Sequence, residues 1–366
     1  RERSVRKIMT KISRTTDMTQ GSEMRHIIMF SLPLLAGNLL QQTYNIVDTM
    51  VVGRYLGDDA LAAVGATGSI TYLFYTLCIG LSVGAGIIVA QYFGAGKKKA
   101  LRSAVFNSAL VTAIFGVVIS LLSVPAAKPI LELLKVPDKL IGDSVTYMQI
   151  ACGGTIAVAA YNWINAIMRA LGDSKTPLIF LGAASLLNAL LDLLFVVVFK
   201  FGIAGAAWAT VLTQALSAIS CIVYCFAVSG EIKLTADDLH ADKDMMSRCV
   251  KTGVPIAIQN GLISVSMVAL QRVTNGFGET VMAAYTVSMR IEQFVQQPFS
   301  SLNAAVSTFT GQNIGAGKEK RAQKGLACAI KISVIFSAVV LVLFALFGGA
   351  ITSWFVKGKT VISISA

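Results

Sequence analysis

The sequence predicts an all-helical protein that crosses a membrane several times. Hydrophobic residues make up 55% of the 366 residues, only 14% are charged, and the mean hydropathy is +0.70. Soluble domains carry about a quarter charged residues, and the apolar residues here form runs long enough to span a bilayer. Because a helix satisfies its own backbone hydrogen bonds in lipid, the composition indicates an all-α polytopic membrane protein.

Apolar segments separated by short polar loops define the predicted helices. Pro and Gly inside several of them are compatible with membrane helices, where neighbouring helices satisfy the freed backbone groups. A tenth span is expected to begin near Val361. The nine predicted spans are 27–50, 61–92, 103–124, 143–168, 177–199, 203–228, 250–274, 281–311 and 326–350.

The basic residues predict the orientation of these spans. The net charge is +12, and Lys and Arg lie mostly in the loops, 21 on the side of the N-terminus and 8 on the opposite side. The positive-inside rule then places the N-terminus in the cytoplasm. We therefore expect a multi-pass plasma-membrane protein whose loops meet anionic headgroups, and we expect no nucleic-acid partner.

An internal repeat divides the chain into two similar halves. AQYFGAGKKKA (90–100) matches GQNIGAGKEKR (311–321), and Pro33 and Asn38 recur as Pro255 and Asn260. Six spans per repeat is an even number, so the two copies are parallel repeats that enclose a site near the midplane. A complete second repeat would run about 84 residues further, so we expect it to be truncated after about three helices. The predicted domains are a cytoplasmic tail (1–26), an N-lobe with helices 1–6 (27–228), a cytoplasmic linker (229–249) and a partial C-lobe with helices 7–9 and the start of a tenth (250–366).

Acidic residues inside two spans mark a candidate ion site. Asp48 ends a polar stripe of the first span that contains Asn38, Gln41 and Asn45. Such an acid costs roughly 2.5–3.5 kcal/mol at the bilayer centre, so by default it indicates a functional site.

A second acid lies in the fifth span. Asp192 follows Asn188 by one turn, on the same helix face. Two carboxylates in one cavity, with oxygens such as that of Thr210 nearby, suit a proton or a sodium ion. Apart from Na⁺ at Asp48, Asn188 and Asp192, we expect no metal and no cofactor.

Other polar residues are candidates for lining a substrate cavity. Arg290 and Glu292 are two positions apart, so they do not form a simple ion pair along one helix face. Gln293 belongs to a second polar face of the same span, and a structural network between helices remains an alternative. The expected cavity residues are Gln41, Asn45, Gln259, Arg290, Glu292 and Gln293.

The sequence offers little for enzymatic chemistry. Its six cysteines are scattered without a CxxC motif, and both histidines lie outside the spans. GAGK at 94–97 and 315–318 lacks the spacing of a nucleotide-binding loop. We therefore expect a protein that is not an enzyme.

The repeated Q-x-x-G-A-G-K turns, the Pro-bearing first and seventh spans and the six-plus-six plan resemble the multidrug and toxic compound extrusion (MATE) family of secondary transporters. The resemblance covers the chain from about residue 24. It implies efflux of bulky, often cationic organic compounds in exchange for Na⁺ or H⁺, by two lobes that open alternately. One branch of the family has an N-lobe cation site, which Asp48, Asn188 and Asp192 match, and the resemblance adds Tyr147 and Thr210 as further ligands.

The leading hypothesis is therefore a monomeric cation-coupled antiporter of small, cationic organic compounds. One alternative is a flippase or exporter of lipid-linked or other amphipathic cargo on the same fold. The acidic residues of the N-lobe cavity argue against a pyrophosphate cargo. A second alternative is a truncated remnant that does not transport.

Overall fold

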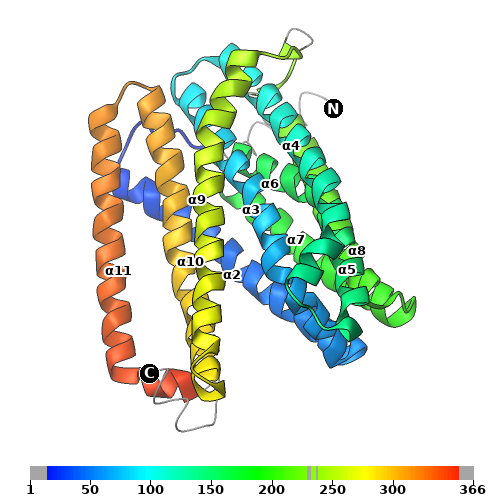
Figure 1. Ribbon diagram of the computed structural model, residues 1–366. Helices are drawn as coiled ribbons and strands as arrows, with labels where there is room; N and C mark the ends of the chain where they lie inside the picture. Colours follow the sequence, from blue (N-terminus) through cyan, green and yellow to red (C-terminus); the bar gives the residue numbers. More distant parts are fainter. Residues whose placement is uncertain (1–14, 229–231, 236–237, 354–366) are drawn as a thin grey trace.

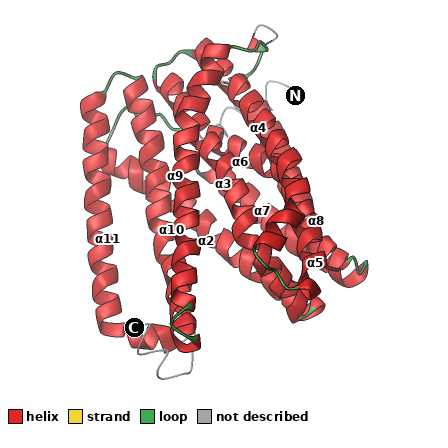
Figure 2. Ribbon diagram, in the orientation of Figure 1, coloured by secondary structure: helices red, strands yellow, loops and turns green. Residues whose placement is uncertain are grey.

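The structure is a helical bundle. The computed structural model describes residues 15–228, 232–235 and 238–353, and within these ranges it contains helices joined by short connections and no strand (Figures 1 and 2). The predicted all-helical class is therefore confirmed. The α-helices of the described residues are α2 (Glu23–Leu56), α3 (Asp58–Gly94), α4 (Lys98–Leu133), α5 (Asp138–Gly153), α6 (Thr155–Ala170), α7 (Lys175–Asp192), α8 (Gly202–Val228), α9 (Lys243–Asn275), α10 (Glu279–Gly315) and α11 (Glu319–Ser353).

The helices extend beyond the predicted apolar segments at nearly every end. Six of them are long and apolar enough to cross a membrane, and the bent pair α5–α6 would add a seventh. Polar side chains in the middle turns of α2 and α10 explain why these two long helices fall outside that set. The start of a tenth span predicted near Val361 lies outside the described residues.

The predicted fourth span, 143–168, is bent rather than continuous. Its halves α5 and α6 meet at an angle of 43° at Gly154. A Cβ atom at Gly154 would overlap the side chain of Val211 on α8. The bend therefore coincides with a position where only glycine lets α8 pack this closely.

The seventh predicted span begins earlier than its apolar sequence suggests. Helix α9 begins at Lys243, inside the segment 229–249 that was predicted to be a linker. The Asp242 side chain accepts hydrogen bonds from the backbone N–H groups of Asp244 and Met245 at 2.9 and 3.2 Å. This N-cap satisfies two of the donors that the first turn leaves free, so the helix starts in polar sequence.

Two groups of helices lie side by side (Figure 1). Helices α3–α8 lie on one side of the bundle and α9–α11 on the other, and we refer to these two sets as groups, although α9 packs mainly against α3. Helix α2 runs obliquely from α10 and α11 towards α7 and α8. We call the end of the bundle that carries residues 15–22, the turns 95–97 and 316–318 and the segment before α9 the N-terminal face. Both groups contribute to this face.

At the N-terminal face the two groups touch through backbone atoms. A Cβ atom at Gly94 would overlap the backbone of Gln312, and one at Gly315 would overlap the backbone of Gln91. Further along α3, a Cβ atom at Gly84 would likewise overlap the backbone of Gly253 on α9. The absence of side chains at these positions lets the groups approach closely.

Candidate cation and transport site

The centre of the candidate site is a buried pair of polar residues on α7. The side chain of Asp192 is 0% exposed, and that of Asn188, one turn earlier, is 1% exposed. The α-helix ends at Asp192 and continues as a π-helical turn, Leu193–Val198. Single π-turns inside helices are frequent at functional sites, and here the turn changes the helix register directly after the acid.

Asp48 on α2 faces the Asp192 carboxyl group, close enough for each acid to affect the other electrostatically. Tyr147 on α5, which is partly buried, lies beside both acids. Tyr44, one turn before Asp48 on α2, approaches the hydroxyl group of Thr210 on α8. The structure thus brings together side chains from α2, α5, α7 and α8.

Many polar atoms in this cluster have no hydrogen-bond partner within the protein. They are Oδ1 of Asp48, both side-chain amide atoms of Asn188 and both carboxyl oxygens of Asp192. A buried polar group without a partner costs roughly 1–3 kcal/mol, and more when it is charged. The arrangement is therefore suited to a proton, a bound cation or ordered water.

An apolar cluster lies next to the site, on the side away from the N-terminal face. Val52 on α2, Ala63 on α3 and Val196 in the π-helical turn are buried there, and Tyr147 packs against them. Asp48 is eight residues before the end of α2, which corresponds to about 12 Å along the helix. The acids therefore lie within the bundle, not at the end of α2.

The other predicted cavity residues lie on α2, α9 and α10, and their side chains are exposed. They line neither the cavity beside residues 15–18 nor the one beside residues 97–103, both of which lie at the N-terminal face. Two of them form side-chain hydrogen bonds within their own helix: Asn45 donates to Gln42 at 3.4 Å, and Glu292 accepts from Gln296 at 2.8 Å. These predicted cavity residues are Gln41, Asn45, Gln259, Arg290, Glu292 and Gln293.

Two tyrosines of the site were missed by the sequence analysis. Tyr44 lies beside Asp48 and Thr210, and Tyr75 on α3 lies near Tyr147 and donates to the carbonyl oxygen of Ala151 at 3.0 Å. Tyr44 is four residues before Asp48, so its position on the same helix face was a usable signal. No comparable signal identifies Tyr75, because an isolated tyrosine in an apolar helix is usually part of the core.

A multi-pass helical bundle that buries unpartnered carboxyl groups has the architecture of a membrane transporter. The MatE family profile matches residues 33–194 and 255–366. The chain therefore belongs to the MatE family and is a MATE-type efflux transporter by descent.

The chain is also similar to individual proteins. The "Probable multidrug resistance protein YpnP" of Bacillus subtilis is 32% identical over 307 residues, which cover 83% of this chain and 68% of that protein. The "FAD transporter" of Shewanella oneidensis is 24% identical over 338 residues, covering 90% and 74%. A solved structure described as the outward-facing conformation of a multidrug resistance MATE family transporter matches with a TM-score of 0.89 at 24% identity, covering 96% of this chain and 79% of the other.

Proposed function

We propose that this protein exports bulky, cationic organic compounds in exchange for H⁺ or Na⁺ bound at Asp48, Asn188 and Asp192. The observation that carries the proposal is the set of five unpartnered side-chain atoms on these three residues. Carboxylate and amide oxygens are the ligands that hard cations prefer. Tyr147 lies beside the two acids and Thr210 lies next to Tyr44, and both would complete the site.

Competition for the same carboxyl groups would couple the two fluxes. A proton or sodium ion neutralises Asp48 and Asp192 in one state, and an organic cation replaces it in the other. Since each ligand lowers the affinity for the other by the same factor, binding of the ion promotes release of the cargo. Gln41, Asn45, Gln259, Arg290, Glu292 and Gln293 would line the path of the larger ligand.

The transport cycle would use two lobes, 27–228 and 250–366, that alternate in access. Paired features at corresponding positions support this division. Gly57 and Gly278 both have positive φ, at 88° and 91°, and Gly96 and Gly317 do as well, at 67° and 70°. Because the groups are packed backbone to backbone at the N-terminal face, the described state would be open on the other side.

We further propose that the N-terminal face is cytoplasmic, that the protein lies in the plasma membrane and that it works as a monomer. The excess of Lys and Arg in the loops of this face supports the orientation. With the acids in the half of the bundle away from this face, the ion would enter from outside.

Ethidium export tests the function. Export would be measured in everted vesicles with a sodium gradient and a proton gradient imposed separately. We expect export with one of the two gradients, and we expect Asp192→Asn to abolish it while membrane insertion is unchanged. The matched control is Asp143→Asn, an identical change at an exposed position of α5. Gradient-driven export by a correctly inserted Asp192→Asn variant would refute the role of the acid.

A second candidate cargo is an amphipathic anion, including lipid-linked compounds. Arg290 supports it, because this exposed residue on α10 belongs to none of the ion pairs that the described residues form. The two cargo classes are separated by Arg290→Gln: loss of the positive charge should lower export of an anion and should not lower export of ethidium.

A further inference from the structure

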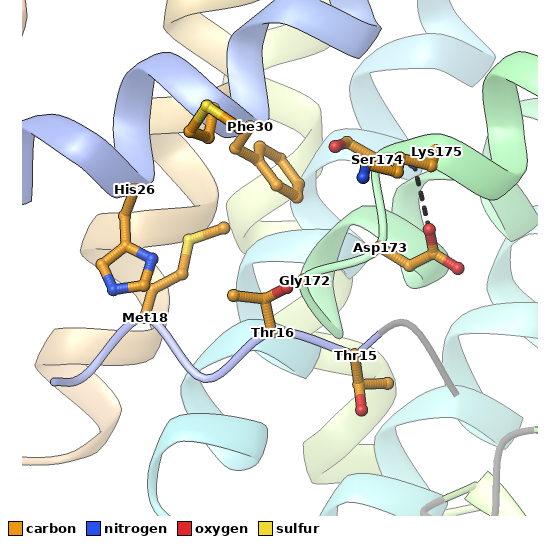
Figure 3. Close-up of a pocket in the computed structure, with 10 residues that line it drawn as sticks. Thr15, Thr16, Met18, His26, Phe30, Gly172, Asp173, Ser174 and Lys175 are labelled. Atoms are coloured by element: carbon orange, nitrogen blue, oxygen red, sulfur yellow. Dashed lines mark hydrogen bonds between the residues drawn. The ribbon is translucent and has the colours of Figure 1, made fainter. Parts of the chain in front are cut away.

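Residues 15–22, which we call the strap, cross the N-terminal face before α2 begins. Figure 3 shows Thr15, Thr16 and Met18 of the strap beside the α6–α7 connection at Gly172. The strap forms one wall of a cavity of about 460 Å³, whose other walls come from the start of α2 and from this connection. Met18 is 1% exposed. The strap is therefore packed into the protein.

One buried amide ties the strap to both groups of helices. The backbone N–H of Met18 donates to Oε1 of Gln312 on α10 at 2.9 Å, and Nε2 of Gln312 donates to the carbonyl oxygen of Ala170 at the end of α6 at 2.9 Å. Asn313, also buried, donates to the carbonyl oxygen of Met18 at 3.2 Å. α6 and α10 belong to different groups, so this network spans the interface.

Arg321 on α11 is the principal fastening of the strap. Its guanidinium group forms an ion pair with Glu23 at 3.1 Å and donates to several strap carbonyl oxygens. The acceptors, with their shortest distances, are Met18 at 3.2 Å, Gln20 at 3.0 Å and Gly21 at 2.7 Å. A planar guanidinium group has five donors in a fixed fork, an arrangement that lysine cannot reproduce. The strap is therefore held by directed hydrogen bonds from the guanidinium group as well as by its charge.

Neighbouring contacts extend this fastening on both sides. Nζ of Lys318 donates to the carbonyl oxygen of Thr19 at 2.9 Å, and the Arg321 guanidinium lies over the ring of Phe309, 5.3 Å from its centre. On the other side, the backbone of Thr16 lies against Gly172, where a Cβ atom would overlap it. The strap thus contacts α10 and α11 at one end and the α6–α7 connection at the other.

We propose that the strap is a latch that keeps the N-terminal face closed, and that Arg321 is the residue that positions it. This inference rests on the proposed alternation of the two lobes. For the N-terminal face to open, the α9–α11 group must separate from α6, which requires the Gln312–Ala170 bond to break. In this step the strap leaves Arg321 and stays against Gly172. Release of the latch is a step of each transport cycle.

Distance measurement between spin labels tests the latch without any transport assay. The labels are placed at Lys99→Cys on α4 and Lys320→Cys on α11, two exposed positions near the N-terminal face, with Cys328 replaced by Ser. We expect Arg321→Gln to increase the population with the longer distance by roughly fivefold or more, the lower end of typical coupling between sites. The matched control is Lys324→Gln, which removes an exposed charge from the same helix.

An unchanged distance distribution in Arg321→Gln would overturn the proposal. A second experiment tests the latch if the Arg321→Gln variant does not insert into the membrane. Cysteines at Thr19 and Lys318, joined by a short bifunctional reagent, should stop ion-driven export until the link is cleaved, whereas each single cysteine should not. Export with the link intact would also overturn the latch. Because the distance measurement needs no cargo, a failure of the latch is distinguishable from a failure of the proposed antiport.

Discussion

The backbone N–H of Asp242 donates a 2.8 Å hydrogen bond to Oδ1 of Asn107, which joins the segment before α9 to α4. Nδ2 of the same fully buried asparagine donates to the carbonyl oxygen of His240 at 3.3 Å. The strap before α2 is fastened to α10 and α11, and the segment before α9 is fastened to α4. Each proposed lobe therefore holds the segment that precedes the first helix of the other.

Asn107→Ala should separate this segment from α4. The change removes the acceptor of the Asp242 N–H and one contact of the His240 carbonyl oxygen, and a buried unsatisfied group costs about 1–3 kcal/mol. We expect a lower Tm in detergent and faster amide hydrogen exchange at Asp242. Asn303→Ala, the same change at an exposed position of α10, should leave both unchanged, and equal exchange in the two variants would contradict the prediction.

Asp238 makes the docking of the same segment dependent on pH. The hydroxyl and backbone N–H groups of Thr235 donate to its carboxylate at 2.6 and 2.8 Å, and Arg102 forms an ion pair with it at 3.0 Å. The Thr235 hydrogen bonds, followed by the Arg102 charge, lower the pKa of Asp238 below its usual value.

A carboxyl group with a lowered pKa stabilises the folded state above its unfolded pKa of about 3.9 and loses this effect as the pH falls through the lower folded value. We therefore expect the protection of the Thr235 amide, corrected for intrinsic exchange, to stay constant from about pH 8 to about pH 5. It should fall only below about pH 4. Asp238→Asn should lose protection at every pH, and a decrease in the wild type near neutral pH would be inconsistent with this assignment.

Asn188 offers the neutral ligand of the proposed cation site. Its buried amide group has no partner of its own, so Asn188→Ala should remove a ligand without breaking a hydrogen bond. We expect gradient-driven export to fall at least about fivefold, in the range typical of coupling between sites, with unchanged insertion. Asn303→Ala again serves as the control. Wild-type export rates in Asn188→Ala would exclude this residue from the site.

The bend between α5 and α6 can be tested by two adjacent glycines. A Cβ atom at Gly154 would overlap the side chain of Val211, whereas one at Gly153 would meet only a Val124 methyl group at 3.8 Å. Overpacking costs typically 1–3 kcal/mol, so Gly154→Ala should lower the Tm and Gly153→Ala should not. Val211→Ala should restore much of the loss. Equal effects of the two glycine substitutions would show that the bend does not depend on this contact.

The helices could be predicted from the sequence because each long apolar segment has one stable conformation in lipid. The grouping of Asp48 with Asp192 was also predictable, since an acid is costly inside a span. The bend at Gly154 was not, because glycine is tolerated in membrane helices and its partner Val211 is distant in sequence. Nor was the early start of α9, which depends on the Asp242 cap and on docking to α4.

The strap was missed for a different reason. Its residues show no apolar periodicity, and its partner Gln312 lies 294 positions from Met18. Contacts this distant in sequence leave no local pattern. The only available signal was the pair of adjacent amides, Gln312 and Asn313, at the end of an apolar span. In isolation that pair is equally typical of a helix that ends at the membrane surface.

Gly94 and Gly315 test whether close packing at the N-terminal face controls its opening. A Cβ atom at either position would overlap the backbone of the opposite group, at Gln312 or Gln91. Backbone cannot rotate away as a flexible side chain can, so Gly94→Ala and Gly315→Ala should each force the two groups apart. We expect a larger long-distance population between labels at positions 99 and 320.

The matched control is Gly68→Ala on α3, where an added Cβ atom meets nothing within 4 Å. It should leave the distance distribution unchanged. Combining Gly94→Ala with Arg321→Gln separates the two contributions, because the turn and the latch act at different atoms of the same face. Effects that add would mean that the face is held at two independent places. An effect of Gly94→Ala that disappears once Arg321 is replaced would mean that the glycine contact acts only by positioning the strap.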